Sequence, residues 1–226
     1  MKISMFGTGV VGQTIAAKLS GLGHDVMVGT RAPDATLARA EKDALGFPPF
    51  RDWHAQHAAV RLGTFAEAAA HGELAFNVLS GQAAVATLGA SAEALAGKVL
   101  VDVSNPLDFS KGFPPSLTIC NTDSLGEQIK RALPRTHVVK SLNTVNAFLM
   151  VDPGQLAAGE HTMFVCGNHP EAKSKVTQIL REWFGWKDVL DLGDITNARG
   201  TEMLLPLWTR LYGALQSPTF SIRVVR

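Results

Sequence analysis

Short apolar runs alternate with longer segments of mixed apolar and polar residues along most of the chain. An apolar run of about four to eight residues is typical of a buried strand, and apolar residues three and four positions apart are typical of a helix. The apolar runs predict strands over residues 2–6, 24–30, 59–63, 73–79, 98–104 and 137–142. The segments between them predict helices over residues 11–22, 34–45, 51–57, 65–72, 82–95 and 124–133.

The rest of the chain is less regular. Residues 105–123 predict a long loop rich in polar residues and proline. The tail predicts a strand over 162–167, a helix over 170–184, a strand over 187–193 and a long helix over 195–213. Pro206 lies inside that last helix and is expected to kink it, because proline cannot donate the helical hydrogen bond.

This order of elements predicts the fold class. Parallel strands need crossover connections of a dozen or so residues, and the crossovers are right-handed. We therefore expect an α/β protein of the Rossmann type, with a doubly wound, mainly parallel sheet and a C-terminal α/β extension. No repeat or linker is visible, so residues 1–226 are predicted to form a single domain, with a dinucleotide-binding core over 1–150 and the extension over 151–226.

Composition and charge narrow the function classes. The formal net charge is +1, which argues against a nucleic-acid or membrane partner and leaves a small molecule as the expected partner. The N-terminal apolar run is too short for a signal peptide, and no stretch reaches the ~18 apolar residues that a membrane helix needs. Cys120 and Cys166 form no CxxC motif, which suits a reducing compartment, and we expect a cytoplasmic location.

The segment GTGVVG at residues 7–12 carries the main functional signal. It fits the pattern G-x-G-x-x-G and lies between a predicted strand and a predicted helix, which is the context of a dinucleotide-binding turn. Gly7 permits the tight turn, Gly9 lets the backbone approach a pyrophosphate, and Gly12 lets the helix pack against the strand. The predicted cofactor-binding residues of this turn are Gly7, Thr8, Gly9, Val10, Val11 and Gly12.

The end of the second predicted strand indicates which dinucleotide binds. An NAD-binding protein usually carries an acid about 20 residues beyond the turn. Thr30 and Arg31 stand there instead, and the nearest acid is Asp34. A guanidinium can pair with a 2′-phosphate and a hydroxyl can donate to it, so NADP(H) is favoured over NAD(H). The alternative is a solvated loop arginine.

Further cofactor contacts are expected where other parallel strands end, because ligands of such sheets lie beyond the carboxyl ends of the strands. Each of these residues could instead cap a helix or form a turn, but they share one predicted edge. They are Ser80, Gly81, Gln82, Ser104, Asn105, Pro106, Leu107, Asn143 and Thr144.

No established catalytic motif is present. Tyr212 is followed by Gln216 where a Tyr-x-x-x-Lys pair needs lysine, and no G-x-S-x-G or HExxH motif occurs. His54 and His57 have no third partner, so no metal site is predicted. Lys140 and Asn143 are the candidate polar groups near a nicotinamide, and a structural role for a buried Lys140 is the alternative. A reductase without a proton donor suits a flavin or deazaflavin acceptor, whose ring takes a hydride directly.

A family resemblance is carried by four segments of the chain. They are GTGVVGQTIAAKLSGLGHDVMVGTR, KVLVDVSNPL, HVVKSLNTVNA and MFVCGN. In this order they resemble the deazaflavin (coenzyme F-420)-dependent NADP oxidoreductases, and also the cytosolic reductase domain of the six-transmembrane metalloreductases. The resemblance extends from Met1 to about Phe184. It implies that Thr30 and Arg31 bind the 2′-phosphate, that the second ring lies between the strand ends and the C-terminal part, and that the chain forms a homodimer.

These signals predict a soluble NADPH-dependent oxidoreductase that transfers a hydride between NADP(H) and a deazaflavin, flavin or similar acceptor. One alternative is a non-catalytic NADP(H)-binding sensor or regulatory protein. Another is a β-hydroxyacid dehydrogenase or imine reductase, which would need a larger helical domain than the residues after Met150 supply.

Overall fold

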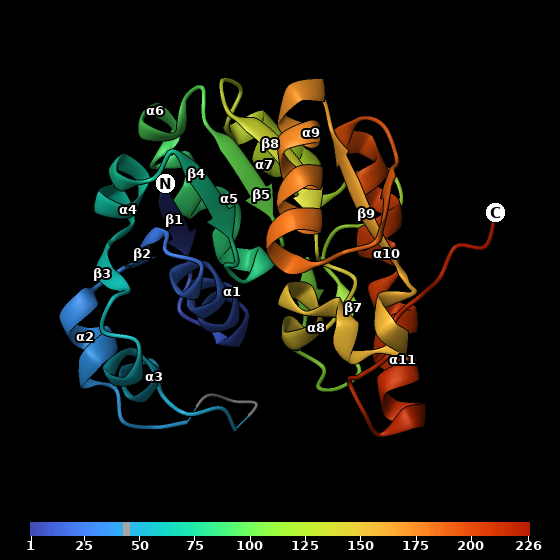
Figure 1. Cartoon of the computed structure of the whole chain (residues 1–226), viewed down its shortest axis with the longest axis horizontal. Coiled ribbons are helices and arrows are strands. Elements are labelled where there is room, and N and C mark those ends of the chain that lie inside the picture. Colours follow the sequence, from blue (N-terminus) through green and yellow to red (C-terminus); the bar gives the residue numbers. More distant parts are fainter. Residues whose placement is uncertain (43–45) are drawn as a thin grey trace.

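An eight-stranded sheet forms the centre of the protein, as the computed structural model shows for the described residues, 1–42 and 46–226 (Figure 1). The strand order is β10-β9-β8-β5-β4-β1-β2-β3. The strands are β1 Lys2–Phe6, β2 Asp25–Thr30, β3 Arg61–Thr64, β4 Leu74–Asn77, β5 Val99–Asp102, β8 His137–Ser141, β9 Thr162–Gly167 and β10 Asp188–Asp191. Neighbouring strands are parallel except β8 and β9, so the predicted Rossmann-type, mainly parallel sheet is confirmed.

β9 runs antiparallel to β8, so it begins at the edge of the sheet where β8 ends. The connection between them contains α8 (Ala147–Val151) and two single turns, η1 (Pro153–Gln155) and η2 (Ala157–Gly159). This connection does not return the chain to the start of β8.

Helices cover both faces of the sheet, and each face has its own hydrophobic core. On one face lie α1 (Val10–Gly21), α3 (Phe50–Gln56), α8 and α9 (Pro170–Ile179), with Ile15, Leu19 and Trp186 in the core. On the other lie α4 (Phe65–His71), α5 (Gly81–Gly89), α6 (Ala92–Leu95), α7 (Leu125–Ala132) and α10 (Ala198–Met203).

Several predicted helices differ from the observed ones. The helix expected over 34–45 is α2 (Pro33–Ala38), and residues 43–45 of that prediction lie outside the described residues. Arg39 has an extended backbone. Thr36 is the buried residue of α2, and a short helix with so little packing does not continue. The helix expected over 82–95 is divided into α5 and α6.

The C-terminal helix is also divided. The segment expected to be helical over 195–213 consists of the turn η4 (Ile195–Asn197), α10 and α11 (Leu205–Leu215). Pro206 lies in the first turn of α11, where its missing N–H is tolerated. The loop expected over 105–123 contains a small hairpin, β6 (Leu107–Asp108) with β7 (Ser116–Leu117). The helix expected over 170–184 is α9 followed by a wider turn, η3 (Leu180–Phe184).

Among the described residues, no helix combines the length and the apolar character needed to cross a membrane.

Candidate functional site

The glycine turn after β1 is as tight as the sequence pattern requires. Gly7 has a φ of +127°, and a Cβ there would lie 3.0 Å from the carbonyl oxygen of Val78. A Cβ on Gly12 would lie 2.5 Å from the carbonyl oxygen of Gly7, a distance that side chains do not tolerate. Gly7 and Gly12 therefore bring α1 directly onto the end of β1.

Gly9 has a different environment, which fits a bound phosphate. A Cβ on Gly9 would meet no atom within 4 Å, so open space faces the turn. Gly9 is also the N-cap of α1, no side chain caps that end, and its first turn carries no acid. The N–H groups of Val10, Val11 and Gly12 and the helix dipole are thus available to an anion.

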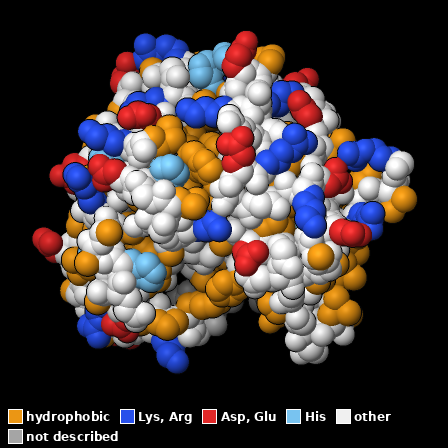
Figure 2. All heavy atoms as spheres, viewed as in Figure 1, with side chains coloured by type: hydrophobic (Ala, Val, Ile, Leu, Met, Phe, Trp, Pro, Cys, Tyr) orange, Lys and Arg blue, Asp and Glu red, His pale blue; other side chains and the backbone are white. Residues whose placement is uncertain are grey.

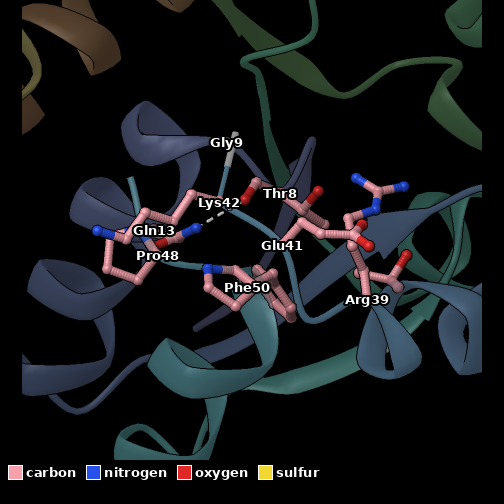
Figure 3. A pocket seen from close by; sticks show the side chains of 10 residues that line it. Thr8, Gly9, Gln13, Arg39, Glu41, Lys42, Pro48 and Phe50 are labelled. Carbon is pink, nitrogen blue, oxygen red and sulfur yellow. Dashed lines mark hydrogen bonds between the residues drawn. The ribbon is translucent and has the colours of Figure 1, made fainter. Parts of the chain in front are cut away.

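A pocket of about 330 Å³ lies beside this turn. Figure 3 shows Thr8, Gly9 and Gln13 on one side of it, with the Gln13 amide donating to the Thr8 carbonyl at 2.9 Å. The pocket is lined by Thr8, Gly9, Gln13, Thr36, Arg39, Glu41, Lys42, Pro48, Pro49 and Phe50. Two cations and one acid thus surround the space next to the phosphate turn.

The end of β2 lies close to this pocket. Thr30 is buried, and its hydroxyl lies 2.9 Å from the hydroxyl of Thr36. Thr36 donates its proton to the Ala32 carbonyl, so Thr30 must be the donor in that pair. Thr30 could donate to a phosphate only after its hydroxyl rotates.

Two arginines near the end of β2 are free to bind an anion. Arg31 and Arg39 are both exposed, and neither forms an ion pair or hydrogen bond within residues 1–42 and 46–226. Arg39 lines the pocket and Arg31 does not. The sequence prediction singled out Arg31 and missed Arg39, which the expected helix over 34–45 would have placed differently.

The predicted residues after β4, β5 and β8 meet at one edge, since these strands are parallel neighbours. A Cβ on Gly81 would lie 2.4 Å from the carbonyl oxygen of Asn105, so the start of α5 touches the turn after β5. Asn143 donates its amide to Asn105 Oδ1 at 2.9 Å. In the space-filling view, the lower edge of the molecule, toward which these strands run, is hollowed (Figure 2). Ser80 and Thr144 lie on these turns, and Gln82 is the second residue of α5.

Lys140 is completely buried, and its ammonium donates to three protein oxygens. They are Asp102 Oδ2 at 2.9 Å, Glu202 Oε1 at 2.8 Å and the Ser104 carbonyl at 2.5 Å. Burial alone would lower the pKa of Lys140, but the carboxylates of Asp102 and Glu202 outweigh it and raise that pKa. Lys140 therefore stays charged and has no proton directed at a ligand, which favours the structural alternative.

His54 and His57 serve packing. His54 Nε2 lies 2.9 Å from the Val60 carbonyl, and the ring of His57 stacks on Trp53. Among the described residues, no group of three or more histidine, cysteine, aspartate or glutamate side chains could hold a metal ion.

Comparisons with known proteins identify the family of this chain. Residues 2–106 match the family model described as NADP oxidoreductase, coenzyme F420-dependent. The F420-dependent NADP reductase of Methanothermobacter marburgensis is 30% identical over 216 residues, covering 93% of this chain and 92% of the relative. The chain belongs to the F420-dependent NADP oxidoreductase family.

Two further similarities define the relationship. A solved structure from Arthrobacter sp. FB24, provisionally designated an F420-dependent NADP reductase, has a TM-score of 0.94 and 54% identity, with full coverage of both chains. The metalloreductase STEAP3 of Rattus norvegicus is 29% identical over 212 residues, which is 92% of this chain but 38% of that protein. The expected resemblance to both groups is confirmed, and the chain is an NADP-dependent oxidoreductase.

Sequence reasoning missed two groups of residues in this NADP oxidoreductase. The first lines the pocket: Gln13, Thr36, Arg39, Lys42 and Phe50. The second is the pair Thr201 and Glu202 on α10, which contacts Asn143 on the turn after β8 and Lys140 within β8. Asp102 and Lys140, opposite charges inside two apolar runs, signal a buried pair, but no local pattern signals Thr201 or Glu202.

Proposed function

We propose that this NADP-dependent oxidoreductase transfers a hydride from NADPH to a flat ring acceptor of the deazaflavin or flavin type. In this step a hydride leaves C4 of the dihydronicotinamide and is added to the acceptor ring. NADPH becomes NADP⁺, and the acceptor is reduced. The family description and the name of the Methanothermobacter relative, which refer to coenzyme F420, support this acceptor class.

One observation carries the proposal. The cationic side chain of Lys140, near the predicted nicotinamide edge, is enclosed by its three acceptors. Among the described residues, the turns after β4, β5 and β8 otherwise present amides and hydroxyls, such as Asn143, Thr144 and Ser80. Reduction of a carbonyl needs a proton donor, whereas a flavin-type ring accepts the hydride directly.

The 2′-phosphate of NADP(H) is proposed to lie between the glycine turn and the two free arginines, Arg31 and Arg39. Thr8 would border it, as the pocket position suggests, and the open face of Gly9 is left for the pyrophosphate. Bidentate guanidinium contacts suit a phosphate. The charge of Glu41 is balanced by that of Lys42, so the two arginines leave this region with a net positive charge.

Oxidation of NADPH in the presence of FMN, FAD, coenzyme F420 and quinones tests the proposal. We expect turnover with at least one flat ring acceptor and a strong preference for NADPH over NADH. Tight NADPH binding without turnover with any acceptor would support the alternative, a non-catalytic NADP(H) sensor with similar affinity for NADP⁺ and NADPH.

The alternative of a β-hydroxyacid dehydrogenase or imine reductase is disfavoured by the C-terminal part. Residues after Met150 add β9, β10 and short helices to the same sheet rather than building a large helical domain.

A homodimer and a cytoplasmic location remain proposals. Leu207, Tyr212 and Leu215 of α11 are exposed, and neighbouring Phe113 is also exposed, which supports an apolar contact between two copies. Light scattering coupled to gel filtration tests the dimer. The free thiols of Cys120 and Cys166 support a reducing compartment.

A further inference from the structure

Three buried charged side chains meet beneath the turn after β5. Asp102 and Lys140 are direct partners in neighbouring strands, and Glu202 reaches them from α10. At most 1% of each side chain is exposed. The carboxylates of Asp102 and Glu202 face the single ammonium of Lys140, so the cluster has an excess negative charge. The Glu202 carboxylate lies at the start of α7. There the N–H groups of Leu125 and Gly126 donate to Glu202 at 2.8 and 3.0 Å, favourably with the helix dipole.

This cluster fixes every polar group of Ser104. The Ser104 hydroxyl and N–H donate to Asp102 Oδ1 at 2.6 and 3.2 Å, and the Ser104 carbonyl accepts from Lys140. Asn77 donates to the same Asp102 oxygen at 2.8 Å. The next residue, Asn105, therefore leaves the sheet in a defined direction.

The residue beside Glu202 holds the neighbouring turn. Asn143 donates to the carbonyl of Thr201 at 3.1 Å as well as to Asn105. The preceding residue, Leu142, is buried and has a φ of +65°, a left-handed conformation that is strained for a non-glycine residue. Such a conformation persists where its surroundings enforce it, so α10 and the turn after β8 are held together.

Stability alone does not explain this cluster. Removing charges from water is unfavourable, and apolar residues of similar volume often give an equally stable or more stable core. The groups that the cluster orients, Ser104, Asn105 and Asn143, all lie at the strand ends where the nicotinamide is proposed to bind.

We propose that Lys140 and Glu202 are positioning residues for the nicotinamide half of the cofactor site. Neither touches the cofactor. Lys140 acts through Ser104, because it donates to the Ser104 carbonyl. Glu202 acts through α10, because its bonds connect α10 to α7 and to β8. This inference rests on the proposed function, because it assumes that the nicotinamide lies at the turns after β5 and β8.

Two ligands separate the proposed role from a general structural one. NADPH carries the nicotinamide, and 2′-phospho-ADP-ribose has the same phosphates and adenosine without it. In Glu202→Gln we expect the dissociation constant of NADPH to rise about tenfold, a typical coupling between sites, and that of 2′-phospho-ADP-ribose to stay within about twofold. Glu93→Gln, on the exposed side chain that pairs with Arg135, is the matched control and should change neither constant.

The outcomes are distinguishable. If Glu202→Gln weakens the binding of both ligands equally, or of neither, the positioning role is wrong. If the wild-type protein binds 2′-phospho-ADP-ribose no more tightly than ADP-ribose, the proposed NADP site fails instead. Should Glu202→Gln not fold, Glu202→Asp keeps the charge and is expected to show the same selective loss.

The wild-type protein offers a test that needs no variant. Because coupling is reciprocal, NADPH should slow hydrogen exchange in α10 and at the start of α7 more than 2′-phospho-ADP-ribose does. Equal protection by the two ligands would overturn the inference.

Discussion

Asn105 and Asn143 bind each other in both directions across the ends of β5 and β8. The Asn143 amide donates to Asn105 Oδ1 at 2.9 Å, and the Asn105 amide donates to the Asn143 carbonyl at 3.0 Å. Asn143→Ala removes the first bond and the bond to Thr201. We expect a loss of about 1–3 kcal/mol in the free energy of unfolding, because buried acceptors are left without donors. Urea unfolding measures it.

The matched control for this prediction is Asn197→Ala, on an exposed residue whose amide makes one long bond, at 3.3 Å, to the Asp194 carbonyl. It should lie within about 0.5 kcal/mol of wild type. An equal effect of the two alanine variants would contradict the prediction.

Gly9 and Gly12 should respond differently to the same substitution. Gly9→Ala places its methyl in open space, so the protein should unfold at nearly the wild-type urea concentration while NADPH binds at least about tenfold more weakly. Gly12→Ala forces a methyl against the Gly7 carbonyl and should destabilise the protein by about 1–3 kcal/mol. Normal NADPH binding by a folded Gly9→Ala variant would argue against a phosphate at this turn.

Arg31 and Arg39 should both determine the choice of cofactor. Replacing either with alanine is expected to weaken NADPH binding by about 1–3 kcal/mol, the scale of a lost charged hydrogen bond, with little effect on NADH. Titration of each variant with both cofactors measures this. Arg181→Ala, at an exposed residue on η3, is the control. Equal losses for NADPH and NADH would mean that the arginine does not contact the 2′-phosphate.

The pair between Glu127 and Arg199 should make stability depend on pH. Arg199 donates to both carboxylate oxygens of Glu127, at 2.6 and 2.8 Å, and this contact lowers the pKa of Glu127 below its ordinary 4.5. The stabilisation is complete above pH 4.5 and is lost as the pH falls through the lowered pKa. Arg199→Gln should therefore lose less stability on acidification than wild type.

Urea unfolding at neutral pH and at about pH 3 measures the difference for each protein, with Arg181→Gln as the control. The prediction fails if the wild-type protein and Arg199→Gln lose the same free energy of unfolding between the two pH values.

The two thiols should differ in reactivity. Cys166 is buried, and burial raises the pKa of its thiol to about 12, so almost no thiolate exists at neutral pH. Cys120 is exposed. Iodoacetamide followed by peptide mapping should find Cys120 alkylated and Cys166 protected until the protein unfolds, and native Cys120→Ser should take up no label. Equal labelling of both would contradict this.

The parts of the fold that depend on nearby residues could be predicted from the sequence. The strand over 2–6, the glycine turn and the helix after it are contiguous, and the reason for each glycine lies within the turn or in one neighbouring strand. The parallel order of β1 to β8 followed from crossover length. The reversal at β9 could not be predicted, because residues 142–161 are enough chain for either a parallel or an antiparallel neighbour.

The contacts that the C-terminal part makes with the site could not be predicted from the sequence either. Asp102 and Lys140 signal a buried pair from sequence, since opposite charges interrupt two apolar runs, but their register required the sheet. Glu202 reads as an ordinary acid in a helical pattern. Its bonds to Leu125 and Gly126 span 77 and 76 positions, and no local pattern encodes contacts of that range.

The reversed direction of β9 also decides which part of the chain completes the strand-end edge. β9 and β10 run away from the edge where the nicotinamide is proposed to bind, and the chain returns there in α10. The residues that line the pocket beside the phosphate turn all come from the first quarter of the chain, whereas Thr201 and Glu202 come from its last eighth. A chain that lacks α10 would therefore lose the contacts to Asn143 and Lys140, which belong to the half where hydride transfer is proposed, and would keep every residue of the pocket.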